Sequence, residues 1–249
     1  MVIDLNSDLG EGFGAWTMGD DAALLDIVTS ANIACGFHAG DPAIMRRTCE
    51  LAVAHQVRIG AHISYRDLAG FGRRRVEVPP AELTAESLYQ IGALDALARA
   101  AGDRVRYVKP HGALYHSAAS DRSAAEAVVA ALVAFGGLSL LGPADSALAS
   151  AAAAAGIPFH AEGFADRGYT PEATLVPRGR EDAVLASDAA LRQAISIAVD
   201  GRARTAAGDE VRVEVRSLCV HGDSPDAVHM ARSIRQSLLD QGVELRSFT

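Results

Sequence analysis

The most constraining feature of this sequence is a unit that recurs along its whole length: a short apolar run, a polar loop and an alanine-rich helical pattern. Seven such runs are typical of buried β-strands, and with their polar ends they span 3–12, 32–41, 59–62, 105–112, 138–142, 157–163 and 213–223. Strands that alternate with helices form βα units around a parallel sheet. Seven units in 249 residues favour a closed or nearly closed barrel over an open sheet, although periodicity alone does not decide between them.

The segments between these runs show alanine and leucine at helical spacing. Two of them begin with a capping side chain before a proline, at Asp41-Pro42 and Ser224-Pro225. The expected helices are Ala43 to His55, Ala81 to Ala101, Ser123 to Phe135, Ala144 to Ala155, Ser187 to Val199 and Pro225 to Gln241. The turn at 206–209 predicts a hairpin before the last strand. One domain over residues 1–249 is expected.

Composition and charge limit the function classes. At 49% hydrophobic and 22% charged residues, the chain is typical of a soluble globular protein. A net charge of −8 argues against a nucleic-acid partner, because such proteins concentrate positive charge. The sequence shows no N-terminal signal and no run near the ~18 apolar residues of a membrane span, so we expect a cytoplasmic protein without a membrane partner. Three cysteines without C-x-x-C spacing indicate neither a disulfide framework nor a zinc knuckle.

Side chains capable of catalysis gather where the apolar runs end. All 23 basic residues are arginine except Lys109, which follows the run 105–108. A chain that otherwise uses arginine keeps a lysine where a compact ammonium is needed. Active sites of β/α barrels form at the carboxyl ends of the strands, and four of the eight histidines fall there: His38, His62, His111 and His221. The remaining four are expected outside the core of the site: His55, His116, His160 and His229.

Other polar residues at strand ends admit two interpretations. Asp8 and Glu11 are either catalytic carboxylates or caps of a following helix, where the dipole favours negative charge. Asp166-Arg167 is either a structural ion pair or a clamp for a substrate carboxylate. The glycines of segment 10–14 match no phosphate-loop pattern, so a nucleotide would bind without a P-loop.

Six motifs, in order from residue 4 to residue 223, resemble the LamB/YcsF family, which forms one of the subunits of the ATP-dependent 5-oxoprolinase. They are DLNSDLGEGFG (4–14), ANIACGFHAGDP (31–42), DLAGFGRR (67–74), VKPHGALY (108–115), EGFADRGY (162–169) and CVHGD (219–223). The resemblance implies a distorted seven-stranded β/α barrel of the glycoside hydrolase/deacetylase type. It also implies hydrolysis of the lactam of 5-oxo-L-proline to L-glutamate, coupled to ATP hydrolysis, in a complex with two further subunits.

The implied reaction gives roles to the strand-end residues. If ATP phosphorylates the lactam carbonyl oxygen, water attacks the carbon and the ring nitrogen leaves as an amine. These steps need a cation, a base and an acid, and Lys109 suits the first role, Asp8 or Glu11 the second and His111 the third. ATP is the expected co-substrate, with Mg²⁺, and a partner protein can supply part of its site. Expected substrate contacts are Asn6, Asn32, His38, His62, Glu162, Arg167, Arg178 and His221.

Two segments depart from the family pattern. Where the family reads His-Pro-Gly-Tyr-Pro-Asp, residues 62–67 of this chain are His-Ile-Ser-Tyr-Arg-Asp. Pro177 and Asp182 stand where the family tends to have serine and glycine, whereas Arg178 matches. We therefore expect the 62–67 loop to have its own shape beside the substrate.

Two further hypotheses stay open. Asp8, His38 and His62 can form a divalent metal site that activates water for an ATP-independent amide hydrolase or deacetylase on the same barrel. The H-x-x-x-H spacing common in those enzymes is absent, because Asp41 and Pro42 follow His38. Alternatively, the chain is a non-catalytic subunit that binds a small acid for a partner. Metal content and turnover in the full complex separate these hypotheses.

Overall fold

Parallel strands close into a barrel in the computed structural model, which describes residues 1–222 and 226–249. The seven barrel strands are β1 (Val2–Leu9), β2 (Ser30–Ala34), β3 (Arg58–Ile63), β4 (Tyr107–Pro110), β5 (Ser139–Gly142), β6 (Phe159–Phe164) and β9 (Ser217–Cys219). They pair in this order, and β9 returns to β1, where Leu218 lies opposite Leu5. The predicted strands and the closed barrel are confirmed.

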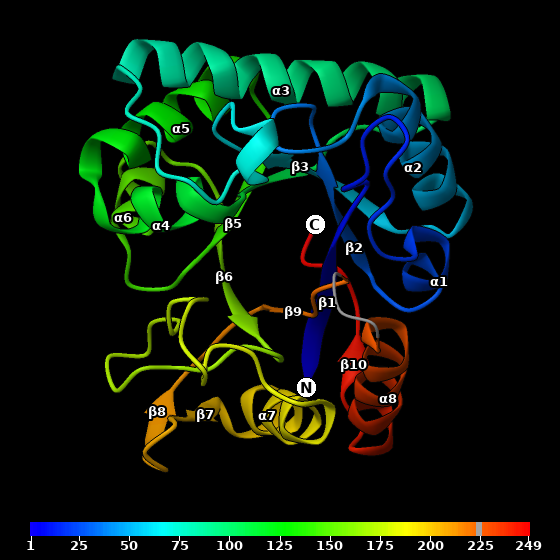
Figure 1. Ribbon diagram of the computed structural model, residues 1–249, viewed down its shortest axis with the longest axis vertical. Helices are drawn as coiled ribbons and strands as arrows, with labels where there is room; N and C mark the ends of the chain where they lie inside the picture. Colours follow the sequence, from blue (N-terminus) through cyan, green and yellow to red (C-terminus); the bar gives the residue numbers. More distant parts are fainter. Residues whose placement is uncertain (223–225) are drawn as a thin grey trace.

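Helices surround the barrel (Figure 1). They are α1 (Asp21–Leu25), α2 (Pro42–Ala54), α3 (Pro80–Ala101), α4 (Gly112–Ser120), α5 (Arg122–Phe135), α6 (Ala147–Ala154), α7 (Ser187–Asp200) and α8 (Ala227–Asp240), with the 3-10 turn η1 (Leu68–Gly70). None of the described helices is long and apolar enough to cross a membrane. The predicted cap at Asp41 is confirmed, because its carboxylate accepts hydrogen bonds from the N–H groups of Ala43 and Ile44. The predicted start at Ser224-Pro225 lies outside the described residues.

The elements differ from the prediction in a few places. Helix α6 begins at Ala147 rather than Ala144, because the Ser146 hydroxyl caps it by accepting from the Ala149 N–H. The sequence pattern does not predict α1, which has five residues, or α4, which starts directly at the polar end of β4. The predicted hairpin is present as β7 (Arg202–Arg204) and β8 (Glu210–Arg212). A short strand, β10 (Glu244–Leu245), pairs with the start of β1 and is too brief to show a pattern.

The C-terminal residues close the end of the barrel formed by the amino ends of the strands. Phe248 packs against Tyr107 and His160, with ring centroids 4.9 and 4.6 Å away. The Ser247 hydroxyl lies 3.0 Å from that of Ser30, at the start of β2. In Figure 1 the chain accordingly ends inside the ring of helices. The carboxyl ends of the strands are left as the open mouth of the barrel.

Gly60 in β3 marks a position where the barrel interior has no room for a side chain. A Cβ there would lie 2.2 Å from Cζ of the buried Tyr107 ring on β4. The Tyr107 hydroxyl donates to Asn32 Oδ1 at 2.7 Å, so a displaced ring would break a buried hydrogen bond. We expect Gly60→Ala to lower the free energy of unfolding by about 3 kcal/mol, measured by urea denaturation.

The matched control for this substitution is Gly92→Ala in α3. Among the described residues, no heavy atom outside the helix backbone lies within 4 Å of its new Cβ. Alanine in a helix interior is favoured over glycine by about 0.5–1 kcal/mol, so this variant should be slightly more stable than the wild type. Equal effects of the two substitutions would contradict the packing argument.

Candidate active site

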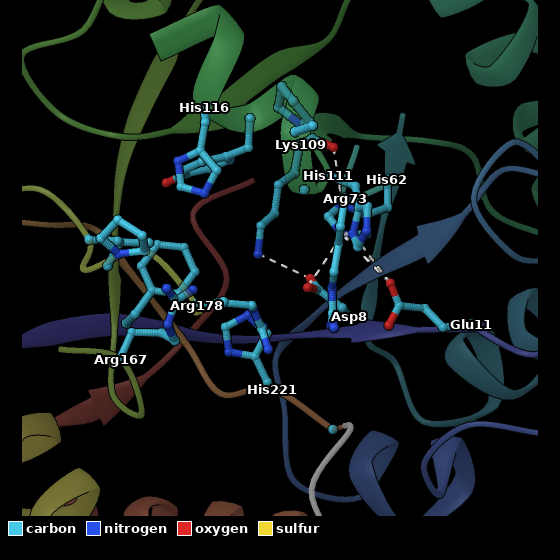
Figure 2. Close-up of a pocket in the computed structure, with 18 residues that line it drawn as sticks. Asp8, Glu11, His62, Arg73, Lys109, His111, His116, Arg167, Arg178 and His221 are labelled. Atoms are coloured by element: carbon cyan, nitrogen blue, oxygen red, sulfur yellow. Dashed lines mark hydrogen bonds and ion pairs between the residues drawn. The ribbon is translucent and has the colours of Figure 1, made fainter. Parts of the chain in front are cut away.

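A cavity of about 320 Å³ opens at the carboxyl ends of the strands. Asp8 near the end of β1, Lys109 on β4 and His221 just after β9 all line it. Figure 2 shows these side chains turned toward a common space, with Glu11 and His62 beside Asp8. Residues that are far apart in the sequence therefore meet at the mouth of the barrel.

Lys109 lies in a buried ionic network, with its side chain 2% exposed. Its Nζ is 3.0 Å from Asp8 Oδ1, 2.7 Å from Glu162 Oε1 and 3.3 Å from Cys219 Sγ. Burial opposes the charge of the ammonium, but Asp8 and the other acidic neighbours outweigh it and raise the pKa of Lys109 well above its usual value. Lys109 is therefore a fixed positive charge at the cavity wall.

Asp8 is held through both of its carboxylate oxygens. Its Oδ1 accepts hydrogen bonds from Lys109 and from Asn32 Nδ2, the latter at 2.8 Å, and its Oδ2 lies 3.3 Å from His62 Nε2. Burial favours the neutral acid, but His62 and Lys109 hold the pKa of Asp8 well below its usual range. Asp8 is therefore ionised. It does not cap a helix, because Asp20 caps α1.

Asn6 and Asn32 lie beneath the cavity rather than in its wall. Both side chains are fully buried in the barrel. The amide of Asn6 donates to Ser217 Oγ at 2.6 Å, and that of Asn32 donates to Asn6 Oδ1 at 2.7 Å as well as to Asp8. The two amides therefore form a buried hydrogen-bonded chain that ends at the Asp8 carboxylate.

Three histidines and Glu11 form a compact cluster next to Asp8. His38 Nε2 lies 3.0 Å from Glu11 Oε1, and His62 Nε2 lies 3.0 Å from His111 Nδ1. The rings of His38 and His111 are stacked, with centroids 3.8 Å apart. Burial, reinforced by neighbouring histidines, holds the pKa of His38 and of His111 well below the usual value. These two imidazoles are therefore neutral.

His38 and Glu162 stand behind the cavity wall rather than in it. The His38 side chain is fully buried, and it meets Glu11, which does line the cavity. The Glu162 side chain is also fully buried and faces Lys109. Both residues, predicted to contact the substrate, support side chains that line the cavity.

His221 pairs with Asp166 across the cavity from the cluster. Its Nδ1 lies 2.9 Å from Asp166 Oδ1, and its backbone N–H donates to Asp166 Oδ2 at 3.1 Å. Burial disfavours the imidazolium, but the Asp166 carboxylate outweighs it and raises the pKa of His221. His221 therefore keeps its proton to a higher pH than an ordinary histidine.

Three arginines, Arg73, Arg167 and Arg178, also line the cavity. Figure 2 places Arg167 and Arg178 together on one side of it. Arg167 is buried, and its guanidinium donates to the backbone carbonyls of Ala183 and Val176 at 2.8 and 2.7 Å. Of the two interpretations of Asp166-Arg167, the described structure thus shows no direct ion pair, because Asp166 bonds to His221.

The sequence pattern misses part of the cavity wall. Tyr115, His116, Phe164 and Leu175 line it. His116 does not follow a strand, so the pattern places it outside the site. Helix α4, however, begins immediately after His111, and its first turns carry His116 over the mouth. Had the sequence pattern shown that a helix starts at the end of β4, it would have identified His116 as a residue of the site.

The sequence model of the LamB/YcsF family matches residues 3–249. The chain belongs to this family. This LamB/YcsF protein is 65% identical over 249 residues to a 5-oxoprolinase subunit of Nocardia farcinica, with 100% of both chains covered. It also matches the crystal structure of a lactam utilization protein from Thermus thermophilus, with 40% identity, a TM-score of 0.94 and 100% of both chains covered.

More distant structures share the barrel. A peptidoglycan deacetylase from Bacillus subtilis has a TM-score of 0.51 at 13% identity, with 99% of this chain and 87% of that chain covered. A likeness at this identity shows the fold alone. The predicted barrel of the deacetylase type is confirmed for this LamB/YcsF protein.

Proposed function

We propose that this LamB/YcsF protein is one of the subunits of an ATP-dependent 5-oxoprolinase. The enzyme hydrolyses the lactam of 5-oxo-L-proline to L-glutamate while ATP is converted to ADP and phosphate. The names of its relatives support this assignment. The observation that carries it in the structure is the buried Lys109 ammonium, held between Asp8 and Glu162 at a cavity of small-molecule size.

The chemistry requires activation, because a five-membered lactam is an unactivated amide. Phosphorylation of its carbonyl oxygen by ATP makes the carbon electrophilic. Water then adds to that carbon, and the ring nitrogen takes a proton and leaves as the amine. The acyl phosphate that remains is hydrolysed by a second water to the side-chain carboxylate of glutamate and inorganic phosphate. We assign stabilisation of the oxygen or the transferring phosphoryl group to Lys109, and orientation and deprotonation of the water to Asp8.

The proton for the ring nitrogen has a better source than His111. His111 donates from Nε2 to the Phe71 carbonyl, and burial keeps the ring neutral. His221 lines the same cavity and holds an extra proton because of Asp166. We assign the acid role to His221 and a positioning role to His111.

The arginine side of the cavity fits the substrate carboxylate. A guanidinium matches a carboxylate with two parallel hydrogen bonds. Arg178 lines the cavity next to Arg167, whose guanidinium is held in place by backbone carbonyls. With the carboxylate of 5-oxoproline here, the lactam carbonyl extends toward Lys109 and Asp8.

The nucleotide site is proposed to be shared with partners. The cavity of about 320 Å³ is at the low end for small-molecule sites, which suits 5-oxoproline better than 5-oxoproline with a whole nucleotide. We propose that two further subunits complete the enzyme and supply most of the contacts to ATP and Mg²⁺. We also propose that the chain is one barrel domain and works in the cytoplasm, where ATP is available.

Reconstitution tests this proposal. The isolated chain is expected to release negligible glutamate from 5-oxoproline and ATP, and addition of its partner subunits is expected to restore release. ADP formation should rise only when 5-oxoproline is present, because both reactions share one site. Glutamate and ADP are measured in the same samples by coupled assays.

The alternatives give different results in this assay. Lactam cleavage by the single chain without ATP, abolished by a chelator, would favour the metal-dependent amide hydrolase, for which the Glu11 and histidine cluster is the supporting observation. Binding of 5-oxoproline without turnover in the full complex would favour the non-catalytic subunit.

A further inference from the structure

One ring nitrogen of His62 and one of His111 face each other inside the cluster, while the other nitrogen of each ring is held by a backbone carbonyl. His62 Nδ1 lies 3.1 Å from the carbonyl oxygen of Lys109, and His111 Nε2 lies 2.9 Å from that of Phe71. A carbonyl oxygen only accepts, so each of these nitrogens carries the ring N–H. The other two ring nitrogens, His62 Nε2 and His111 Nδ1, face each other across 3.0 Å and lie 4.0 and 3.4 Å from Glu11 Oε1. A cation between these atoms would contact both rings.

The two backbone contacts are of the kind that orient metal-bound histidines. A histidine that ligates a metal through one nitrogen usually donates its other N–H to a carboxylate, a carbonyl or water, which fixes the tautomer and the ring. The segment after η1 also packs tightly on the rings. A Cβ on Gly72 would lie 2.8 Å from His111 Cδ2 and 2.9 Å from His38 Cβ. The rings are therefore held in place before any ligand binds.

Glu11 and His38 complete a set of donors at ligand spacing. Glu11 Oε1 lies 3.0 Å from His38 Nε2, 3.4 Å from His111 Nδ1 and 4.0 Å from His62 Nε2. Donors bonded at about 2.1 Å to a tetrahedral or octahedral ion are about 3.0–3.4 Å apart. Most of these separations already have that value, and all four ligand atoms lie within 4.8 Å of one another.

The charge of the surrounding groups also favours a cation. Glu11 brings a buried carboxylate into contact with the imidazoles, and the buried Asp8 carboxylate lies 3.3 Å from His62 Nε2. Carboxylates this close to the imidazoles attract a cation in a region of low dielectric. Three imidazoles with a carboxylate suit zinc and its neighbours, whereas Mg²⁺ prefers oxygen ligands.

We propose that Glu11, His38, His62 and His111 bind one divalent transition-metal ion, preferentially zinc. The site is distinct from that of the Mg²⁺ that accompanies ATP. Its ligands Glu11, His62 and His111 also line the cavity, so the bound ion polarises the oxygen of an amide held there (Figure 2). The inference does not depend on the proposed function, because metal binding is measured without turnover.

The experiment starts from the full chain, stripped with a chelator and titrated with Zn²⁺ and with Co²⁺. We expect roughly one ion per chain by elemental analysis, a higher Tm with Zn²⁺, and visible Co²⁺ absorption that reports nitrogen ligands. His62→Gln and His111→Gln should each weaken binding by about 10–100-fold or more, since even partners of ligands contribute that much. The matched control is His55→Gln at the half-exposed pair with Asp26, which should bind like the wild type.

A different result would overturn the inference. If the stripped wild-type chain binds neither ion, or if both cluster variants bind as the wild type does, the cluster holds no metal. A proton shared between His62 and His111 would then explain the facing nitrogens, and nitrogen-15 spectra of the stripped chain would show one doubly protonated ring that Zn²⁺ leaves unchanged. The wild-type titration decides the matter even if a variant fails to fold. Loss of glutamate release in the reconstituted enzyme has no bearing on this result.

Discussion

Replacing Lys109 with methionine is expected to abolish glutamate release by the reconstituted enzyme and to lower the free energy of unfolding by about 3–5 kcal/mol. Methionine fills a similar volume but carries no charge. Asp8 and Glu162, which lie 3.0 and 2.7 Å from the ammonium, would then be buried without their cation. Activity is measured as glutamate formed per assembled complex, and stability by urea denaturation.

A second variant separates the two effects. In Lys109→Met combined with Glu162→Gln, one of the buried carboxylates is neutral, so we expect part of the lost stability to return. Activity should stay absent, because the oxygen that develops charge still has no cation. If the double variant recovers both stability and turnover, Lys109 has only a structural role.

Asp8→Asn is expected to reduce turnover by roughly 10²–10⁴, the range for a positioned acid or base. Asparagine is nearly isosteric, but it neither takes a proton from water nor carries negative charge beside Lys109 and His62, its neighbours at 3.0 and 3.3 Å. The measurement is the rate of glutamate release at saturating 5-oxoproline and ATP, with complex formation checked separately.

Asp41→Asn is the matched control for this substitution. Asp41 is a partly exposed carboxylate that caps α2, and asparagine is an equally good cap. Its turnover should therefore equal that of the wild type. An Asp8→Asn enzyme with full turnover and a lower Tm would show that Asp8 only stabilises the barrel.

The barrel could be predicted from the sequence because its elements have strong local signals. The strands are buried on both faces and read as apolar runs, and helices such as α2 have a capping side chain and a proline at their start. Elements with weak signals were missed. Helix α1 has five residues, β10 has two, and α4 starts at a strand end where polar residues predict a loop.

The sequence predicts which residues belong to the candidate site better than it predicts which side chains contact one another there. Strand ends identify Asp8, Lys109 and His221, because parallel strands bring their carboxyl ends to one edge. Sequence order does not show that Asp166 bonds to His221 rather than to Arg167, its neighbour in the chain. Contacts of this kind depend on side-chain directions in the closed barrel, which no local pattern encodes.

The closed barrel likewise determines which residues line the cavity and which lie behind them. The resemblance to the LamB/YcsF family places Asn6 and Asn32 among the expected substrate contacts. Their depth below the mouth follows from strand register, in which Asp8 lies opposite Asn32. Register across neighbouring strands is a tertiary property, so the hydrogen bond between Asn32 and Asp8 could not be predicted from the sequence.

The most direct test of the central claim is to observe where 5-oxo-L-proline binds. The eight histidines serve as probes, because this chain can be labelled with nitrogen-15 histidine and then assembled with unlabelled partners. We predict that 5-oxoproline shifts the ring signals of His62, His111 and His221, which line the cavity, and leaves that of His55, which pairs with Asp26 outside it, unchanged. Unchanged signals from all three cavity histidines in a complex that is turning over 5-oxoproline would contradict the account.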